Sequence, residues 1–475
     1  MKNYQNLKDV QTDLAAGAIS CGSLIDSYLD KIETQKELNI FLEVFAESAK
    51  QIAKEVDEKR VNGTAGRLAG MVVSIKDNIC YKGFKVGASS KILEGFESIY
   101  SSTVVERLLA EDAIIIGRTN CDEFAMGSSN ENSAYGNVKN PLFTNKVPGG
   151  SSGGSAASVT AGMCLASLGS DTGGSIRQPA SFCGNIGLKP TYGRVSRHGL
   201  IAYASSFDQI GPFTNSIYDA ALLLEVMAGA DEYDSTASQR PVPNYSEKIK
   251  PEGSKKKIAY LDCYVNHEGL NQEIKDRTLA VIDKLKAEGH EVEEIKFDYL
   301  DQMVPAYYVL TTAEASSNLA RYDGVHFGHR SSSANNLLST YVKSRSGGFG
   351  KEVKRRIMLG TYVLSAGYYD AYYSKAQKVR RLIKEKSIEI LNEYDFIISP
   401  TTPNPAFNIG SQVDDPIKMY LEDIFTVQAN LSGLPAISLP VGKTTEGLPF
   451  GIQLLANSFE EEKLLSFSEY LINIA

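Results

Sequence analysis

Two loops rich in glycine and serine are the segments of this chain best suited to chemistry. Residues 149–155 read GGSSGGS, and residues 171–177 read DTGGSIR. Because glycine has no Cβ, backbone N–H groups in such loops can approach a reacting atom closely, and a serine between glycines can present its hydroxyl without crowding. The two loops therefore indicate a hydrolytic site with a serine nucleophile.

The second loop contains the preferred nucleophile, Ser175. It follows an apolar segment, residues 163–168, and the backbone N–H groups of Thr172, Gly173, Gly174 and Ser175 are expected to hold the oxyanion. Removing one such donor raises the barrier by about 3 to 4 kcal/mol. A phosphate-binding loop would need G-x-x-x-x-G-K-[ST], and no lysine follows either cluster at that offset. The hydrolase motif G-x-S-x-G is absent at Ser175.

A serine nucleophile requires a base, and Lys76 is the candidate that the sequence favours. It ends the apolar segment 71–75, where a β-strand is expected to stop. A free lysine amine has a pKa of about 10.4, so burial must lower that pKa before the amine can accept a proton at neutral pH. The alternative is a surface lysine paired with the neighbouring Asp77. Sequence distance excludes none of the five histidines as the base: His198, His267, His290, His326 and His329.

Composition places the chain among folded globular proteins and excludes several functional classes. Its 475 residues suffice for one large α/β domain or two smaller ones, and 43% of them are hydrophobic and 22% charged. The formal net charge of -8 argues against a chain that itself wraps nucleic acid. Six cysteines without a C-x-x-C pair, no signal-peptide pattern and no membrane-length apolar segment predict a reduced, cytoplasmic location.

Hydrophobic periodicity predicts an α/β fold built as one large domain. Residues 7–59 have apolar residues at helical spacing, which predicts two amphipathic helices. Short β-branched segments then alternate with helices, an order typical of parallel sheet with crossover helices. We expect N-terminal helices at 1–60 packed on a main domain at 61–475. A mostly helical insertion is expected at about 299–393.

The second half of the chain repeats this alternation. A polar connector, bracketed by residues 241–244 and 251–253, joins the halves, and one sheet is expected to run through both. Residues 436–441 and 449–455 predict a hairpin before a C-terminal helix. The other expected strands are residues 71–75, 113–117, 257–261, 291–297 and 396–399.

Three segments together resemble the amidase signature family. They are SIKDN around Lys76, PGGSSGGS around Ser151 and GSDTGGSIRQPA around Ser175. In that family a strand-end lysine, a serine held by a cis peptide bond and a loop serine form a Ser-cisSer-Lys triad. The resemblance therefore implies a catalytic triad of Lys76, Ser151 and Ser175, with the cis bond between Gly150 and Ser151. It also implies a mixed central β-sheet flanked by helices.

Further segments narrow the resemblance to the glutaminase subunits of tRNA-dependent amidotransferases. It covers nearly the full chain and rests on residues 120–127, 189–197, 314–319, 348–356 and 367–373. Glutamine presents a carboxylate and an ammonium besides its side-chain amide, and both charges need partners in a closed pocket. By match to the motifs, Arg356 is assigned to the carboxylate, with Arg355 as its rival, and Asp423 to the ammonium. Tyr307 is a further candidate for substrate binding.

The resemblance also implies partners. The released ammonia would pass to a partner subunit, where ATP and Mg²⁺ serve the conversion of Glu-tRNA(Gln) to Gln-tRNA(Gln). The complex would be a heterotrimer with subunits B and C, in which this chain binds no cofactor or metal and the partner holds most of the tRNA. The alternatives are a stand-alone amidase for another small amide and a non-catalytic scaffold subunit, which would have lost the triad. Whether Asp-tRNA(Asn) is also amidated is decided outside this chain.

Overall fold

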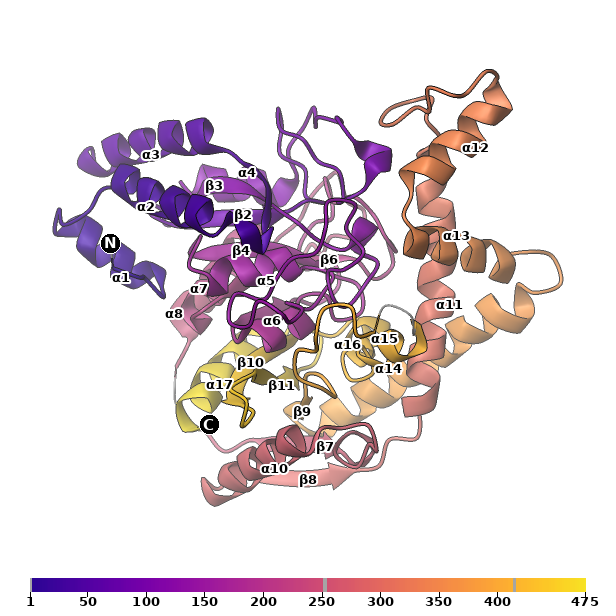
Figure 1. Ribbon diagram of the computed structural model, residues 1–475. Helices are drawn as coiled ribbons and strands as arrows, with labels where there is room; N and C mark the ends of the chain where they lie inside the picture. The colour runs from indigo at the N-terminus through magenta and orange to yellow at the C-terminus, as the bar shows by residue number, and fades with distance from the viewer. Residues whose placement is uncertain (1, 251–253, 413–415) are drawn as a thin grey trace.

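An eleven-stranded β-sheet forms the centre of the protein in the computed structural model, which describes residues 2–250, 254–412 and 416–475 (Figure 1). Residues 251–253 of the predicted connector lie outside the described residues. The strands are β1 (Phe41–Val44), β2 (Val72–Lys76), β3 (Ile114–Thr119), β4 (Ala166–Asp171), β5 (Ile186–Lys189), β6 (Gln209–Thr214), β7 (Lys257–Leu261), β8 (Glu291–Ile295), β9 (Phe396–Pro400), β10 (Ala436–Lys443) and β11 (Pro449–Leu455). Their order across the sheet is β1-β3-β2-β4-β6-β5-β10-β11-β9-β7-β8, so both halves of the chain contribute to one sheet, as predicted.

The sheet is mixed, and β2, β4 and β5 end at the same edge. Strand β2 runs parallel to β3 and β4, and β7 runs parallel to β8 and β9. Strands β4 and β5 are both antiparallel to β6, so β2, β4 and β5 share one direction. Their last residues, Lys76, Asp171 and Lys189, therefore lie along one edge, where α/β sheets commonly bind ligands. The predicted hairpin is confirmed as the antiparallel pair β10–β11.

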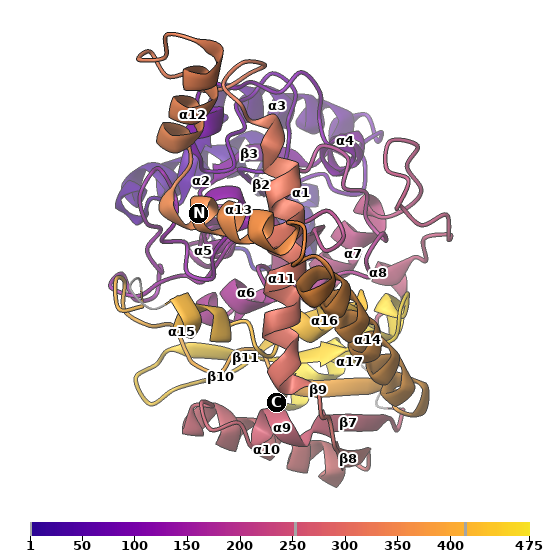
Figure 2. The ribbon, with the colours of Figure 1, turned by 90° about the vertical axis from the view of Figure 1, so that its right-hand side faces the viewer.

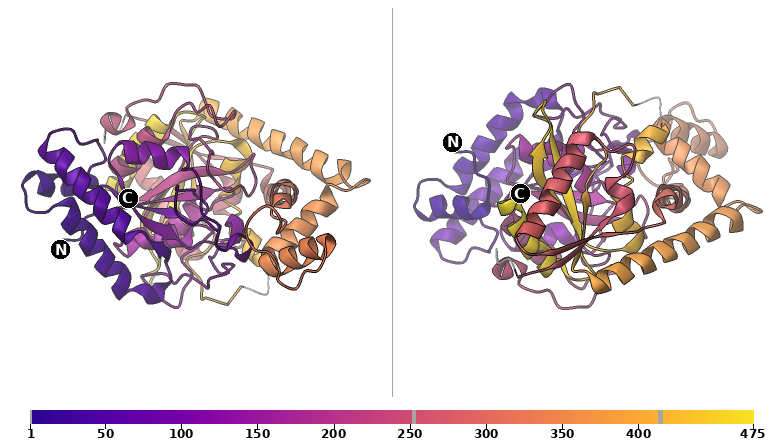
Figure 3. Two further views of the ribbon diagram at one scale, coloured as in Figure 1. Left: turned by 90° about the horizontal axis from the view of Figure 1, so that it is seen from above. Right: turned by 90° about the horizontal axis from the view of Figure 1, so that it is seen from below.

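Helices cover both faces of the sheet (Figures 1 and 3). Every residue of β2, β4, β5, β6, β9 and β11 is buried, as expected for strands covered on both sides. The apolar side chains of helices and strands form one large core cluster. The helices are α1 (Leu7–Ala15), α2 (Cys21–Thr34), α3 (Ala46–Val61), α4 (Thr103–Ala110), α5 (Gly153–Thr160), α6 (Arg177–Cys183), α7 (Ile217–Met227), α8 (Tyr245–Lys248), α9 (Asp262–Val265), α10 (Gln272–Ala287), α11 (Leu300–Asn318), α12 (Leu337–Gly348), α13 (Lys351–Val363), α14 (Lys375–Glu393), α15 (Pro416–Leu421), α16 (Val427–Ser432) and α17 (Glu461–Ile474).

The N-terminal segment differs from its prediction. Instead of two helices it contains three, α1 to α3, together with the edge strand β1. Ser20 starts α2 with a capping box, and the partly buried strand β1 forms by pairing with β3, far along the chain. A four-residue strand of this kind has too little periodicity to be recognised locally. The division into residues 1–60 and 61–475 stays a prediction. Apolar side chains of α1 to α3 belong to the same core cluster as those of the sheet.

Four helices between residues 300 and 393 form a layer on the side of the molecule away from α1 to α3 (Figures 1 and 2). Helix α11 runs the length of this layer, and α13 and α14 pack against it (Figure 2). Helix α12 stands out at one end (Figure 1). This layer places α13 next to the loops that follow the strand ends. No helix in the described ranges has the length and apolar character needed to cross a membrane.

Candidate active site

Lys76 lies at the end of β2 with its side chain completely buried. Its Nζ contacts three serine hydroxyls, at 2.7 Å from Ser151 Oγ, 2.9 Å from Ser152 Oγ and 3.0 Å from Ser170 Oγ. Burial lowers the pKa of Lys76 to about 8. About a tenth of the amine is therefore neutral at pH 7, and the lone pair of this neutral form can accept a proton from a hydroxyl.

The alternative of a surface lysine paired with Asp77 is wrong. The Asp77 carboxylate forms an ion pair with Arg118 and accepts backbone N–H groups from Gly87 and Ser89. Its charge is thus compensated without Lys76. Among the described residues, no histidine hydrogen-bonds to Ser151 or Ser175, so the geometry favours lysine as the base.

Ser151 is held in the first glycine loop by backbone contacts on both sides. The peptide bond between Gly150 and Ser151 is cis, as the resemblance implied. Gly150 N donates to Gln178 Oε1 at 2.9 Å, and Ser151 O accepts from Asp122 N at 3.1 Å. A Cβ on Gly150 would lie 2.1 Å from Asp122 Oδ2, so only glycine fits there. These contacts keep the Ser151 hydroxyl on Lys76.

Ser175 lies between β4 and α6, and it is the triad member nearest to solvent, with 8% of its surface exposed. Its carbonyl oxygen accepts from Ser152 N at 3.3 Å, which joins the two glycine loops. In the described part of the chain its hydroxyl makes no hydrogen bond. Lys76 therefore contacts Ser151 in the structure. Among the described residues, the hydroxyls of Ser151 and Ser175 are not hydrogen-bonded to each other.

The loop before Ser175 is anchored by a buried ion pair. Arg177 Nε and Nη2 each lie 3.1 Å from an oxygen of Asp171, and both side chains are inaccessible to solvent. Although burial acts to raise it, the guanidinium of Arg177 holds the pKa of Asp171 below its ordinary value. Asp171 Oδ1 also accepts from Gly174 N at 2.9 Å.

That contact corrects one expectation about the oxyanion donors. The Gly174 N–H is already committed to Asp171 and is not free for a substrate oxygen. The N–H groups of Thr172, Gly173 and Ser175 donate to no acceptor within the described ranges. Thr172 Oγ1 donates to Asp208 Oδ1 at 2.6 Å, and Thr426 Oγ1 donates to Gly173 O at 2.6 Å, so the loop is tethered on both sides.

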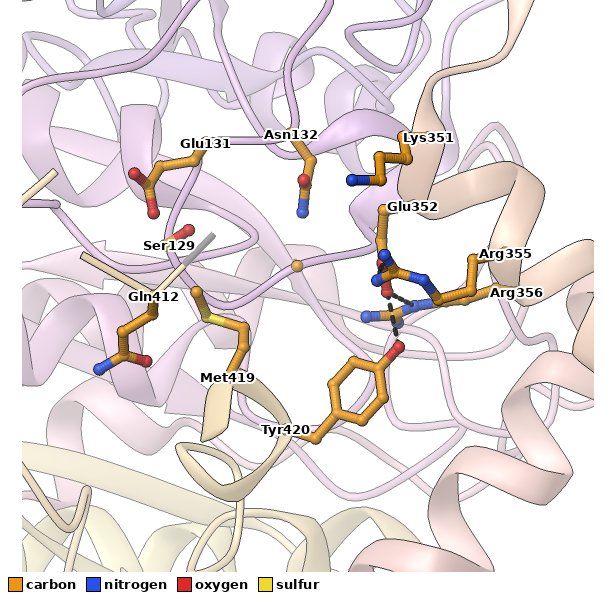
Figure 4. Close-up of a pocket in the computed structure, with 11 residues that line it drawn as sticks. Ser129, Glu131, Asn132, Lys351, Glu352, Arg355, Arg356, Gln412, Met419 and Tyr420 are labelled. Atoms are coloured by element: carbon orange, nitrogen blue, oxygen red, sulfur yellow. Dashed lines mark hydrogen bonds and ion pairs between the residues drawn. The ribbon is translucent and has the colours of Figure 1, made fainter. Parts of the chain in front are cut away.

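Arg355 and Arg356, on α13, line a small pocket with a volume of about 90 Å³ (Figure 4). Arg356 is buried, with Nε donating to Glu352 Oε1 at 2.8 Å and Nη1 donating to the Tyr203 hydroxyl at 2.8 Å. The Arg355 side chain is 37% exposed and also pairs with Glu352. Figure 4 shows that the Tyr420 hydroxyl donates a hydrogen bond to the carboxylate of Glu352. The structure thus brings both rival arginines to one pocket, with Glu352 between them.

Asp423 is buried, and its carboxylate faces polar hydrogen atoms of two side chains. Ser128 Oγ lies 3.0 Å from both carboxylate oxygens, and the Tyr308 hydroxyl donates to Oδ2 at 3.2 Å. Burial raises the pKa of Asp423 to about 7. The guanidinium of Arg356 packs on the ring of Tyr308, with its carbon 5.1 Å from the ring centre, so Tyr308 joins the two predicted charge-binding residues.

Tyr307, the predicted tyrosine, lies elsewhere in the site. A Cβ on Gly173 would be 2.5 Å from the Tyr307 hydroxyl, so this ring covers the oxyanion loop and not Asp423. Its ring also packs edge-on against Phe207, at 6.0 Å between centroids. Adjacent tyrosines on α11 therefore serve different parts of the site.

We call the α13 pocket together with the adjoining Asp423 the charged pocket, and short connections join it to the two glycine loops. Thr426 Oγ1, which holds Gly173, also lies 3.0 Å from Asp423 O. Gln178 Nε2 donates to Ser128 O at 2.8 Å, and Gln178 Oε1 holds the Gly150 N–H. A small molecule with a carboxylate and an ammonium would therefore be anchored next to the three catalytic candidates.

Sequence reasoning missed several residues of this site. Ser170 reaches Lys76 only because β4 pairs with β2, a fact that local patterns do not contain. Glu352 stands four residues before Arg356 on α13, and this helical spacing of opposite charges was a usable signal. Tyr308, the residue after the predicted Tyr307, was not singled out, because helical spacing alone could not rank two adjacent tyrosines.

Known proteins resemble this chain along most of its length. The sequence profile of the family described as Amidase matches residues 23–465. The A subunit of glutamyl-tRNA(Gln) amidotransferase from Chlorobium phaeobacteroides is 53% identical over 470 residues, with 98% of each chain covered. The crystal structure of the corresponding subunit from Thermotoga maritima superposes with a TM-score of 0.78 at 40% identity, over 94% of this chain and 90% of that one. Native peptide amidase from Stenotrophomonas maltophilia gives a TM-score of 0.82 at 28% identity, over 98% and 96%. This chain belongs to the amidase family.

Proposed function

We propose that this chain is the glutamine-hydrolysing subunit of a glutamyl-tRNA(Gln) amidotransferase. The observation that carries the proposal is the buried contact between Lys76 Nζ and Ser151 Oγ, at 2.7 Å. Hydrogen bonds of Thr426, Ser128 and Gln178 link the loops of this contact to Asp423, and Tyr308 links Asp423 to Arg356. Relatives that bear the name of this enzyme's A subunit are similar over 98% or more of both chains, which supports the same assignment.

The reaction begins with Lys76 in its neutral form. Lys76 takes the proton of the Ser151 hydroxyl, Ser151 takes that of Ser175, and Ser175 Oγ attacks the carboxamide carbon of glutamine. The C–N bond then breaks, the proton returns through the same hydroxyls to the leaving ammonia, and a glutamyl ester remains on Ser175. Water attacks this ester, which releases glutamate and restores the hydroxyl. The N–H groups of Thr172, Gly173 and Ser175 would hold the oxyanion.

The hydroxyls of Ser151 and Ser175 must form a hydrogen bond with each other during this cycle. Catalytic hydrogen bonds are often long in the free enzyme and tighten only with substrate bound. The Lys76 amine already has Ser152 and Ser170 as further partners, so it stays in place while the Ser151 hydroxyl turns.

Substrate recognition is assigned to the charged pocket. Arg356 binds the glutamine carboxylate, with Arg355 as the alternative, and Asp423 binds the ammonium. Tyr307 closes the oxyanion loop over the reacting amide. An apolar or aryl amide would offer no ammonium to the buried Asp423 and no carboxylate to Arg356, which disfavours a stand-alone amidase for such substrates.

The ammonia serves a reaction on partner subunits. In the proposed heterotrimer, ATP and Mg²⁺ act on a second subunit that also holds most of the tRNA, and ammonia converts Glu-tRNA(Gln) to Gln-tRNA(Gln). The excess of acidic residues, 57 against 49 lysines and arginines, agrees with limited contact between the bulk of this chain and tRNA.

Purification of the tagged full-length chain with co-expressed partner subunits tests the proposal. We expect recovery of two partners, glutamine hydrolysis and tRNA-dependent amidation. Ser175→Ala should abolish the use of glutamine but leave amidation with added ammonium salt intact. A lone chain with broad amidase activity would indicate a stand-alone amidase. Normal glutamine hydrolysis by the variant would remove Ser175 from its role.

A further inference from the structure

Exposed apolar side chains are concentrated in one stretch of the chain, residues 319–384. We call residues 319–384 the arm; they include α12, α13 and the start of α14. Of the 21 large apolar side chains that are exposed among the described residues, 13 belong to the arm. They are Val325, Phe327, Leu337, Leu338, Tyr341, Val342, Met358, Leu359, Tyr362, Tyr368, Tyr369, Tyr372 and Leu382. Scattered single exposures are ordinary on a monomer, whereas a contiguous group marks a contact surface.

The arrangement on α12 follows helical spacing. Leu337, Leu338, Tyr341 and Val342 recur at intervals of one and four residues, which places them on one side of the helix. Leu338 is 72% exposed and Val342 is 56% exposed. The buried residues of the same helix, Ser344 among them, face the body of the protein. Helix α12 thus presents an apolar side that its own chain does not cover.

Helix α13 has one side that faces the candidate glutamine pocket and one side that is exposed. Glu352 and Arg356 face the candidate glutamine pocket and are buried. Met358 is 73% exposed, and Tyr362 lies one turn further along the outer side. Anything that binds the outer side therefore contacts the helix that carries the candidate carboxylate-binding residue.

Tyrosine rings extend this apolar surface toward α14. The Tyr362 ring lies 4.4 Å from that of Tyr368 and 5.8 Å from that of Tyr372, measured between centroids, and all three side chains are exposed. Next to Tyr372, a groove of about 280 Å³ runs between α11 and α14. It is lined mainly by small apolar residues, including Pro305, Ala306, Ala371 and Val379. Clustered tyrosines beside an apolar groove are typical of protein–protein contact centres.

The arm also has a charge opposite to that of the rest of the chain. It contains 13 lysines and arginines against three aspartates and glutamates, whereas the whole chain has 49 against 57. Within the described structure, only Arg355, Arg356 and Arg381 of these cations form an ion pair with a carboxylate. The uncompensated positive charge favours a partner whose matching surface is acidic.

We infer that the arm is the docking surface for a protein partner with an acidic and apolar face, namely a second subunit of the proposed amidotransferase. This inference rests on the proposed function for the partner's identity. The aliphatic side chains Leu338, Val342 and Met358 decide between protein and RNA. RNA is bound by cations and stacking aromatic rings and gains little from exposed leucine, valine and methionine. Docking on α13 would also connect the partner directly to the glutamine pocket.

The test compares arm variants with matched variants elsewhere on the surface. Val342→Asp and Met358→Asp place a charge in the proposed interface, and Lys378→Glu reverses one of its exposed charges. Val61→Asp and Ile99→Asp are controls at residues that are 89% and 82% exposed outside the arm. Lys54→Glu on α3 is the control for charge reversal.

Binding to the purified partner subunits of the same organism is measured by analytical ultracentrifugation and biolayer interferometry. We expect the apolar arm variants to weaken binding at least tenfold and Lys378→Glu to weaken it severalfold, more so at low salt. The three controls should bind as the wild type does. All variants should keep the wild-type melting temperature and the basal glutamine hydrolysis of the chain alone.

Several results would overturn the inference. They are wild-type affinity in the apolar arm variants, equal losses in the controls, or no binding of partner by the wild type. Loss of binding to tRNA alone, with partner binding unchanged, would assign the arm to RNA and equally overturn the inference. A chain that binds partners through the arm but does not hydrolyse glutamine would instead refute the proposed function and leave the docking surface standing.

Discussion

Two buried lysines at the ends of two strands, Lys76 on β2 and Lys189 on β5, show how the same burial supports different tasks. Both side chains are inaccessible to solvent, and burial lowers the pKa of Lys76 to about 8 and that of Lys189 to about 7. The Lys76 amine contacts hydroxyls, the closest being Ser151 Oγ. The Lys189 amine donates to Pro190 O at 2.9 Å and to Gln209 Oε1 at 3.1 Å.

The difference lies in what the partner atoms can do with a proton. A serine hydroxyl can give its proton to a neutral amine and take another from the next hydroxyl, whereas a carbonyl oxygen has no proton to give. Lys189 therefore acts as a framework group next to the Asp171–Arg177 ion pair, although its pKa is the lower of the two. Contacts, and not the pKa alone, separate a candidate base from a structural lysine.

The largest expected effect is that of Lys76→Met. Removing the amine should lower kcat for glutamine hydrolysis roughly 100-fold to 10,000-fold, the range for loss of a general base. Steady-state kinetics with glutamine measures this, and circular dichroism checks that the variant is folded. A kcat within tenfold of wild type would show that Lys76, like Lys189, is only structural.

A second prediction tests whether the substrate charges bind beside Lys76. Asp423→Asn should raise KM for glutamine roughly 100-fold, because the substrate ammonium would lose its charged partner in a buried site. A small amide without an ammonium should lose far less. Asp219→Asn, a buried aspartate that instead holds Leu7 N, is the control and should leave KM unchanged. Equal losses on both amides would refute the assignment of Asp423.

The pH dependence of the wild type sharpens the comparison further. Only neutral Lys76 can accept a proton, so kcat should fall about tenfold per pH unit as pH drops below about 8 and level off above it. Lys189→Met should retain this profile, since Lys189 has no part in proton transfer. A profile without change between pH 6 and 8 would contradict the role of Lys76.

The smallest effect on activity is expected for Lys189→Met. Its kcat should stay within tenfold of wild type, while the free energy of unfolding falls by about 1–3 kcal/mol because Gln209 and Pro190 lose a buried partner. In the wild type, the folded pKa of Lys189 lies below the unfolded value, so its contribution to stability increases as pH rises from about 7 toward 10. Urea unfolding at several pH values should show a shallower increase in the variant.

Much of the fold could be predicted because the strands are short, apolar and bounded by polar turns. The predicted strand at 257–261 matches β7, and the predicted hairpin matches β10–β11. The N-terminal prediction was wrong because β1 depends on pairing with β3 and not on its own pattern. Long-range pairing of this kind has no local signal.

The candidate site, like the fold, could be predicted from the sequence only in part. Lys76 and the two glycine loops stand out from residue type and spacing alone. The commitment of Gly174 N–H to Asp171, and the separate places of Tyr307 and Tyr308, depend on side-chain directions in the folded chain. Spacing along a sequence does not contain those directions.

The chemical groups of this protein are visible in its amino-acid sequence: a lysine at a strand end, serines among glycines, and a basic, tyrosine-rich segment in an acidic chain. Which of these groups meet depends on the fold. Ser151 and Ser170 lie 75 and 94 positions from Lys76, and they reach its amine because β4 pairs with β2 and the first glycine loop folds over the ends of both strands. The low pKa of Lys76 follows from the same packing, since burial of a charge is a property of the surroundings and not of the residue.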